Sequence, residues 1–181
     1  GNAAKATTTG IELEAQWEAT AELSLRGSIA YNRARYESFP GAPCYSQQTV
    51  EQGCVNGLQN LAGKPLTFSP RWDIALGFTY DIGVANGGDL RLAFSGDVNY
   101  RSSYNADTPL PPALQQSGVA KLDASVRFYS ERSGWELALI GRNLTDKLTI
   151  SQGSSSAASV GEFFALAEQP RQIAVQATAR F

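Results

Sequence analysis

The chain has 181 residues, 43% of them hydrophobic, and its 15 basic and 17 acidic side chains give a formal net charge of −2. Charge this balanced offers no basic stripe for phosphates, so no nucleic-acid partner is expected, and no apolar run reaches the roughly 18 to 20 residues of a membrane-spanning helix. The sequence contains no histidine, which removes Ser-His-Asp, Cys-His and histidine–zinc chemistry, so we expect neither an enzyme nor a cofactor or metal site.

Strict alternation of apolar and polar side chains begins at residues 11–18. Its apolar set is Ile11, Leu13, Ala15 and Trp17, and its polar set is Glu12, Glu14, Gln16 and Glu18. Only an extended strand separates such sets onto opposite faces. A second strand follows over residues 23–31, and its alternation slips beyond Tyr31, where we expect a bulge.

Five further alternating segments complete the pattern. They cover residues 71–82, 89–101, 122–128, 135–139 and 173–181. The longer segments exceed the 5 to 6 residues usual for strands of soluble proteins and reach the roughly 9 to 11 residues that a tilted membrane-spanning strand needs. The sequence therefore predicts an all-β fold, an antiparallel transmembrane β-barrel segment of about seven meander strands.

Short and long connections alternate between these strands. The short ones lie at residues 20–21, 83–88 and 130–134, and the long ones at residues 37–70, 105–118 and 147–169. This plan is typical of outer-membrane barrels, whose turns are periplasmic and whose long loops are extracellular.

Aromatic residues at the strand ends predict two girdles at the level of the lipid headgroups. The girdle at the short turns would contain Trp17, Tyr80, Phe128, Trp135 and Phe181, and the girdle at the long loops would contain Tyr36, Trp72, Tyr100 and Tyr104. The alternative is that these rings pack the core of a soluble sandwich or lipocalin-like barrel. Strand length and the one-sided distribution of long loops favour the girdles.

The second face of the strands is charged. It carries Glu12, Glu14, Glu18, Arg91, Asp97, Arg101, Lys121, Asp123, Arg127, Glu136, Arg142 and Arg180. Small soluble barrels fill their interior with apolar side chains, so this face must border water or a polar plug, and we interpret it as a charged lumen wall. The first and last strands would each leave unpaired backbone groups in hydrocarbon, so we expect further strands to pair there.

Two cysteines, Cys44 and Cys54, lie in a polar stretch rich in Gly, Ser, Gln and Asn. We expect a disulfide that closes a surface loop in an oxidising compartment, because the loop is too polar to bury thiols. Closing a ring of about eleven residues stabilises a loop by about 3 kcal/mol in the chain-entropy model. Two free thiols in a cytosolic loop and a two-cysteine metal site are the alternatives.

Several short segments, in their order and spacing, resemble the C-terminal β-barrel portion of TonB-dependent outer-membrane receptors. They are Gly10-Ile-Glu-Leu-Glu14, Ala30-Tyr31 with Ala34-Arg35-Tyr36, Asn60-Leu-Ala-Gly-Lys-Pro65, Ser69-Pro-Arg-Trp72, Gly141-Arg-Asn-Leu-Thr-Asp-Lys147 and Pro170-Arg-Gln-Ile173 through Phe181. The resemblance implies a plugged barrel of the class with about 22 strands. It also implies import of a scarce nutrient, such as a ferric siderophore, cobalamin or a carbohydrate, with energy from a TonB complex.

The resemblance sets further expectations about partners and extent. Residues 1–181 would be the C-terminal portion of the receptor barrel, a fragment without the plug domain, the TonB box and the N-terminal strands. Its partners would be outer-membrane lipid, those missing strands and plug, the TonB complex acting through the plug, and the barrel-assembly machinery, for which Phe181 would be the C-terminal signal. The location would be the outer membrane of a Gram-negative bacterium. A smaller passive or structural outer-membrane barrel and a secreted soluble binding module remain alternatives, and the substrate-binding residues are not predicted.

Overall fold

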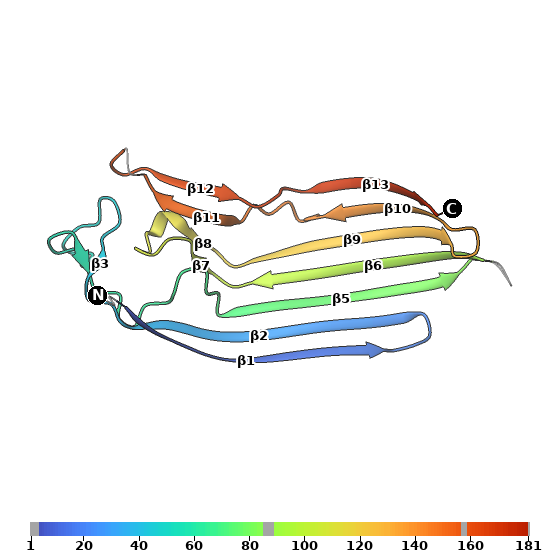
Figure 1. The fold of residues 1–181 in the computed structure, drawn as a ribbon, viewed down its shortest axis with the longest axis horizontal. Helices are drawn as coiled ribbons and strands as arrows, with labels where there is room; N and C mark the ends of the chain where they lie inside the picture. Colours follow the sequence, from blue (N-terminus) through green and yellow to red (C-terminus); the bar gives the residue numbers. More distant parts are fainter. Residues whose placement is uncertain (1–3, 85–88, 157–158, 181) are drawn as a thin grey trace.

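Seven long strands form one antiparallel sheet in the computed structural model, which describes residues 4–84, 89–156 and 159–180 (Figure 1). Their order, β1-β2-β5-β6-β9-β10-β13, places each strand beside the preceding long strand in the chain. Their bounds are Lys5–Glu18 for β1, Leu23–Ser38 for β2, Trp72–Gly83 for β5, Leu90–Arg101 for β6, Val119–Ser130 for β9, Trp135–Arg142 for β10 and Gln172–Ala179 for β13. The all-β meander predicted from alternation is therefore confirmed.

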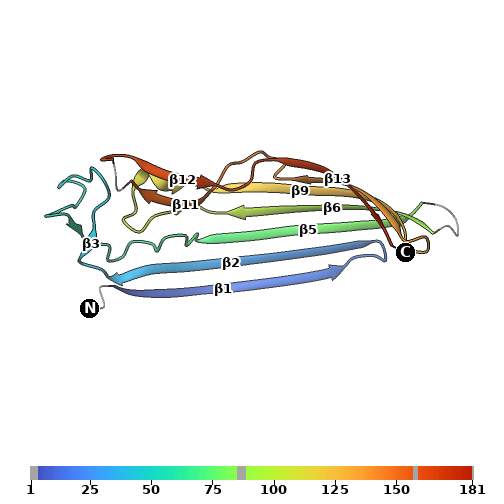
Figure 2. The same cartoon turned by 45° about the horizontal axis from the view of Figure 1, so that its top comes forward.

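The long connections carry small sheets of their own, gathered at one end of the molecule and opposite the short turns (Figures 1 and 2). The pairs are β3 (Ala42–Pro43) with β4 (Leu58–Gln59), β7 (Tyr104–Asn105) with β8 (Gln115–Gln116), and β11 (Ile150–Ser155) with β12 (Phe163–Ala167); a 3-10 turn, η1 (Pro112–Leu114), precedes β8. Among the described residues, no helix is long and apolar enough to cross a membrane.

The strand register places all apolar sets on one side of the sheet, here called the apolar face. Leu13 pairs with Ile29, Ile29 with Ile74, and Ile74 with Tyr100. The apolar face stays exposed, with 74% of Ile11 and 79% of Val175 accessible. The ionised residues of the sheet interior lie on the opposite side, the charged face, because side chains alternate along every strand.

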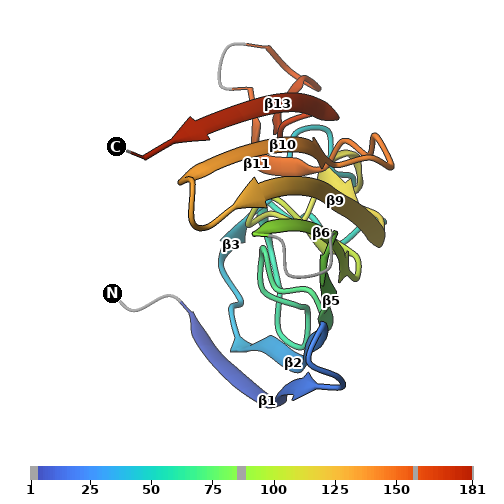
Figure 3. The ribbon, with the colours of Figure 1, turned by 90° about the vertical axis from the view of Figure 1, so that its right-hand side faces the viewer.

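Seen along the strands, the sheet is an open arc with β1 and β13 as its edges (Figure 3). Every residue of β1 is exposed, and all but one of β13. An edge strand presents a row of unpaired backbone N–H and C=O groups, each of which costs several kcal/mol in hydrocarbon. Placed in a membrane, the arc needs neighbours on both sides.

Strand β2 continues to Ser38, and the irregularity expected beyond Tyr31 lies at Glu37, further along the strand than the end of the alternation indicated. The ladder with β1 continues without a break from Tyr31 to Tyr36, and the register shifts only between Lys5 and Ala6. The pattern changes at Tyr31 because β2 outruns β5 there, where Tyr31 pairs with Trp72. Beyond that pair, the inner side chains of β2 pack under a loop.

Gly10 tests this close pairing of β1 and β2. A Cβ atom at Gly10 would overlap the carbonyl oxygen of Tyr31, a backbone atom that cannot move without separating the strands. We therefore expect Gly10→Ala to destabilise the protein by about 1 to 3 kcal/mol, measured as a lower unfolding temperature in detergent. The matched control is Gly83→Ala, since no atom of the described residues lies within 4 Å of a Cβ atom at Gly83. Equal stability of the two variants would contradict the tight pairing.

Candidate functional site

The three long loops, here called loop A (residues 39–71), loop B (102–118) and loop C (143–171), pack against one another through two apolar clusters. The first cluster joins Tyr36 of β2 and Ala42 and Leu61 of loop A to Leu110 of loop B. The second joins loop B to loop C, and it contains Tyr104, Ala106, Leu114, Ile150 and Phe163. Loop B is therefore the centre of one connected layer across the long-loop end.

Hydrogen bonds join the same loops. The Nε2 atom of Gln59 donates to the carbonyl oxygens of Pro43 at 2.8 Å and of Pro109 at 3.0 Å, so one buried amide links loop A to loop B. The backbone N–H of Gly161 in loop C donates to Oγ of Ser46 in loop A at 2.6 Å. These side-chain-to-backbone hydrogen bonds between segments far apart in sequence give the loop layer a defined shape.

Loop A contains the disulfide between Cys44 and Cys54, whose Cα atoms lie 5.8 Å apart. This pairing replaces the two alternatives, free thiols and a two-cysteine metal site. The ring is also closed by backbone hydrogen bonds, from Cys44 N to the carbonyl oxygen of Gly57 at 3.0 Å and from Cys54 N to that of Thr49 at 3.1 Å. The segment is thus a covalently closed projection at the long-loop end.

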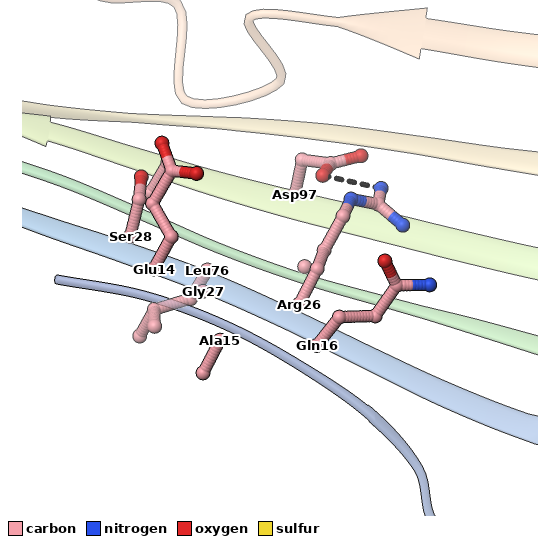
Figure 4. A pocket seen from close by; sticks show the side chains of 10 residues that line it. Glu14, Ala15, Gln16, Arg26, Gly27, Ser28, Leu76 and Asp97 are labelled. Carbon is pink, nitrogen blue, oxygen red and sulfur yellow. Dashed lines mark hydrogen bonds and ion pairs between the residues drawn. The ribbon is translucent and has the colours of Figure 1, made fainter.

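Ion pairs between strands neutralise part of the charged face of the sheet. The guanidinium of Arg26 on β2 reaches across β5 to Asp97 on β6, with 2.5 Å between Nη2 and Oδ1 (Figure 4). It can do so because Gly77 of β5 lies between them, and a Cβ atom there would occupy the space of the pair. Further pairs on this face are Arg91–Asp81, Arg101–Asp73 and Arg127–Glu136.

These pairs decide what the charged face can do. Exposed ion pairs contribute at most about 1 kcal/mol each, so their main effect is to supply a hydrophilic wall with little net charge. Tyr129 adds a hydrogen bond to Asp81 at 2.5 Å. No group of three or more His, Cys, Asp or Glu side chains suited to a metal ion occurs in the described part of the chain.

Loop C is anchored to the sheet by an ion pair that sequence reasoning missed. Nζ of Lys121 on β9 lies 2.5 Å from a carboxylate oxygen of Glu168 and 2.7 Å from Oγ1 of Thr149, whose hydroxyl donates to the same carboxylate at 2.7 Å. The Lys121 and Thr149 hydrogen bonds lower the pKa of Glu168 below its ordinary value of 4.5. Lys121 and Glu168 are 47 residues apart, so no local pattern indicates the contact.

The base of loop C is held by Asn143, another residue that sequence reasoning did not single out as functional. Its φ is +48°, and its side chain, 6% exposed, donates from Nδ2 to the carbonyl oxygens of Lys147 at 2.9 Å and Gln169 at 3.2 Å. Asparagine tolerates this left-handed conformation, and its short amide bonds local backbone groups. The amide thus ties both ends of loop C together.

Six of the aromatic residues expected at the membrane interfaces occupy the apolar face. By register, Trp17, Tyr80, Phe128 and Trp135 lie toward the short turns, and Trp72 and Tyr100 lie toward the long loops. Tyr36 and Tyr104 are corrections: both are buried in the two loop clusters, at 8% and 7% exposure, because each ring packs against loop residues instead of lipid. Phe181, the expected assembly signal, lies outside the described residues.

An exposed apolar face, a charged opposite face and loops gathered at one end define a segment of a transmembrane β-barrel. The chain belongs to the family of TonB-dependent receptor-like β-barrels, whose model matches residues 1–144. Members of this family are transporters in the outer membrane of Gram-negative bacteria, which confirms the predicted resemblance and location. No curated protein matches the sequence significantly.

Two solved structures show the same fold. The ferric yersiniabactin uptake receptor FyuA from Yersinia pestis is 20% identical with a TM-score of 0.73, and the match covers 99% of this chain and 24% of that one. The siderophore receptor PiuA from Acinetobacter baumannii is 15% identical with a TM-score of 0.69, covering 97% of this chain and 22% of that one. The chain thus spans about a quarter of the length of these receptors.

The disulfide in loop A generates a first prediction for the site. Replacing both Cys44 and Cys54 by Ser removes a constraint worth about 3 kcal/mol in the chain-entropy model. We expect proteolysis within loop A of the intact receptor to accelerate by about tenfold or more, while the unfolding temperature of the barrel stays unchanged, because local opening controls cleavage. Adding a thiol reductant to the wild-type protein is the control, and it should reproduce the effect. Unchanged cleavage in both would contradict it.

The Lys121–Glu168 pair generates a pH prediction for loop C. Because the pKa of folded Glu168 lies below 4.5, its stabilisation is present above that pH and is lost as the pH falls through the lowered value. We expect the backbone amides of loop C to exchange hydrogen a few-fold faster, after correction for the intrinsic rate, as the pH falls through this pKa. Glu168→Gln should exchange faster at neutral pH and lose this step, whereas Glu162→Gln in the same loop should behave as wild type. A step that persists in Glu168→Gln would contradict the assignment.

Proposed function

We propose that the chain is the C-terminal portion of the barrel of a TonB-dependent receptor that imports a scarce nutrient into the periplasm. The family match over residues 1–144 is the observation that carries the proposal. The open edges of β1 and β13 support it, because further strands of a larger barrel would pair there. The plug, the N-terminal strands and the TonB complex acting through the plug would be its partners.

The loop layer is the part of the chain that would receive the nutrient. It lies at the extracellular end in the usual orientation of outer-membrane barrels. Its buried amide, Gln59, and its two apolar clusters would hold loops A, B and C as one preorganised surface. Binding to a surface that is already ordered loses less conformational entropy than binding to mobile loops.

A ferric siderophore is the substrate class to test first. Both solved relatives are named as siderophore receptors, FyuA for ferric yersiniabactin. Cobalamin and carbohydrates are the other classes implied by the family resemblance. Specificity in such a site depends on particular side chains and not on the fold. Fold similarity therefore decides only which substrate class is tested first.

The test uses the intact receptor in a host strain lacking its own copy, under iron limitation. We expect uptake of a labelled ferric siderophore that requires both the receptor and a functional TonB complex. Gln59→Ala removes the hydrogen bond to Pro109 of loop B together with those to Pro43 and Gln48 within loop A, each worth about 1 kcal/mol, and should weaken siderophore binding by about tenfold.

Gln176→Ala on β13 is the matched control and should bind as wild type, because within the described part of the chain the side chain of Gln176 bonds only Thr178 beside it. Uptake that continues without TonB would overturn the proposal in favour of a passive barrel. Folding of this chain alone in detergent to a closed, heat-modifiable barrel would favour a smaller structural barrel, and a stable monomer without detergent would favour a soluble binding module.

A further inference from the structure

Two arginines stand on the apolar face where the strands leave the predicted hydrocarbon layer. The ladder between β1 and β2 pairs Tyr31 with Ile11, Arg33 with Thr9 and Arg35 with Thr7. Because side chains alternate and this ladder has no break, Arg33 and Arg35 lie on the same side as Tyr31. Neither faces the charged side of the sheet, where Arg26, Arg91, Arg101 and Arg127 find their carboxylate partners.

Their height matches the edge of a membrane. The ring of Tyr31 packs on Trp72 with centroids 4.8 Å apart, and this pair closes the apolar face at the long-loop end. Arg33 follows Leu23, the first residue of β2, by ten positions, which at about 3.4 Å per residue and a tilt near 40° spans roughly 26 Å of depth. The apolar band of such barrels is about 25 Å tall, so both guanidinium groups stand at its outer border.

The two arginines have no counter-charge within the described residues. The ion pairs of the structure engage Lys5, Arg26, Arg91, Arg101, Lys121, Arg127 and Arg171. Arg33 enters none of them, and Arg35 donates only to the carbonyl oxygen of Gly63, at 3.3 Å. The nearby carboxylate of Glu37 is itself neutralised, by Lys5 at 2.6 Å and by the hydroxyl of Thr7. The positive charge is therefore free to attract an anion.

The surface around them is hollowed on both sides. One recess of about 420 Å³ is lined by Arg33 and Arg35 together with Arg71, Ser69 and Trp72. A second, of about 570 Å³, shares the two arginines and adds Thr9 and Tyr31. Guanidinium groups bind phosphate through paired N–H donors, and aromatic rings below them suit the start of acyl chains.

We propose that Arg33 and Arg35 form a binding site for the phosphate groups of a phosphorylated glycolipid in the outer leaflet of the outer membrane. Basic clusters at the end of a membrane-spanning segment recognise anionic lipid headgroups in this way. The site lies on the outer surface of β2, the strand next to the edge strand β1, and it borders loop A at Gly63, Ser69 and Arg71. Because the two arginines lie on the apolar face and not on the charged face, lipid binding there is distinct from passage of a nutrient through the barrel.

The experiment measures lipid binding to the intact receptor in detergent by native mass spectrometry, with bisphosphorylated lipid A as the probe. We expect Arg33→Gln with Arg35→Gln to lower the affinity about 10- to 30-fold, in line with two lost surface charges, and added salt to weaken wild-type binding. The matched control is Arg132→Gln with Arg180→Gln, which removes two charges at the short-turn end that enter none of the ion pairs among the described residues. This control should bind as wild type.

A second pair of measurements distinguishes recognition of the phosphate groups by paired N–H donors from attraction by charge alone. Dephosphorylated lipid A should bind the wild-type receptor as weakly as the bisphosphorylated lipid binds the Arg33→Gln, Arg35→Gln variant. Replacing both arginines by Lys keeps the charge and loses the paired donors, so we expect an intermediate affinity, and this variant serves if the Gln form does not fold. Equal losses in the two Gln double variants, equal binding of both lipids, or competition by inorganic phosphate at equal concentration would overturn the proposal.

Discussion

The requirement that every backbone N–H and C=O be paired in hydrocarbon governs this chain. It accounts for the long antiparallel ladders, since a strand that crosses a membrane has no water to bond. It also explains the short turns, because a short turn brings the chain directly back into the next ladder and leaves few backbone groups without a partner. Once the ladders are fixed, the two-residue period assigns every side chain to lipid or to the charged face.

The charged face follows from the same constraint. Side chains there border polar surroundings, and because the strands beneath them are rigid, four of the arginines pair with carboxylates across the ladders. Arg26 reaches Asp97 over a full intervening strand because Gly77 has no side chain to block it. Glycine usually weakens a strand, but here Gly77 leaves the space that the ion pair needs.

The sequence was sufficient for the strands, the disulfide and the direction of the loops, since each depends on local patterns. It failed where partners come from distant segments. A bulge directly after Tyr31 would turn Tyr36 outward, whereas the ladder is unbroken as far as Tyr36 and turns this ring into the cluster with Ala42 and Leu61. Tyr104 follows the end of β6, so strand parity does not reach it. The two-residue strands of the loops likewise exist only because tertiary contacts hold them.

In the stretch of β2 beyond Tyr31, alternation places neighbouring residues on opposite faces that have different roles. Ala34 and Tyr36 point toward the loops and are buried, while Arg33 and Arg35 between them point to the outer surface. One strand therefore carries the support of the loop layer on one side and a basic surface on the other. A slip of one residue would exchange them, burying two charges and exposing the core of the loop layer. The register shift between Lys5 and Ala6 lies just past this stretch, so the parity of all four residues is preserved.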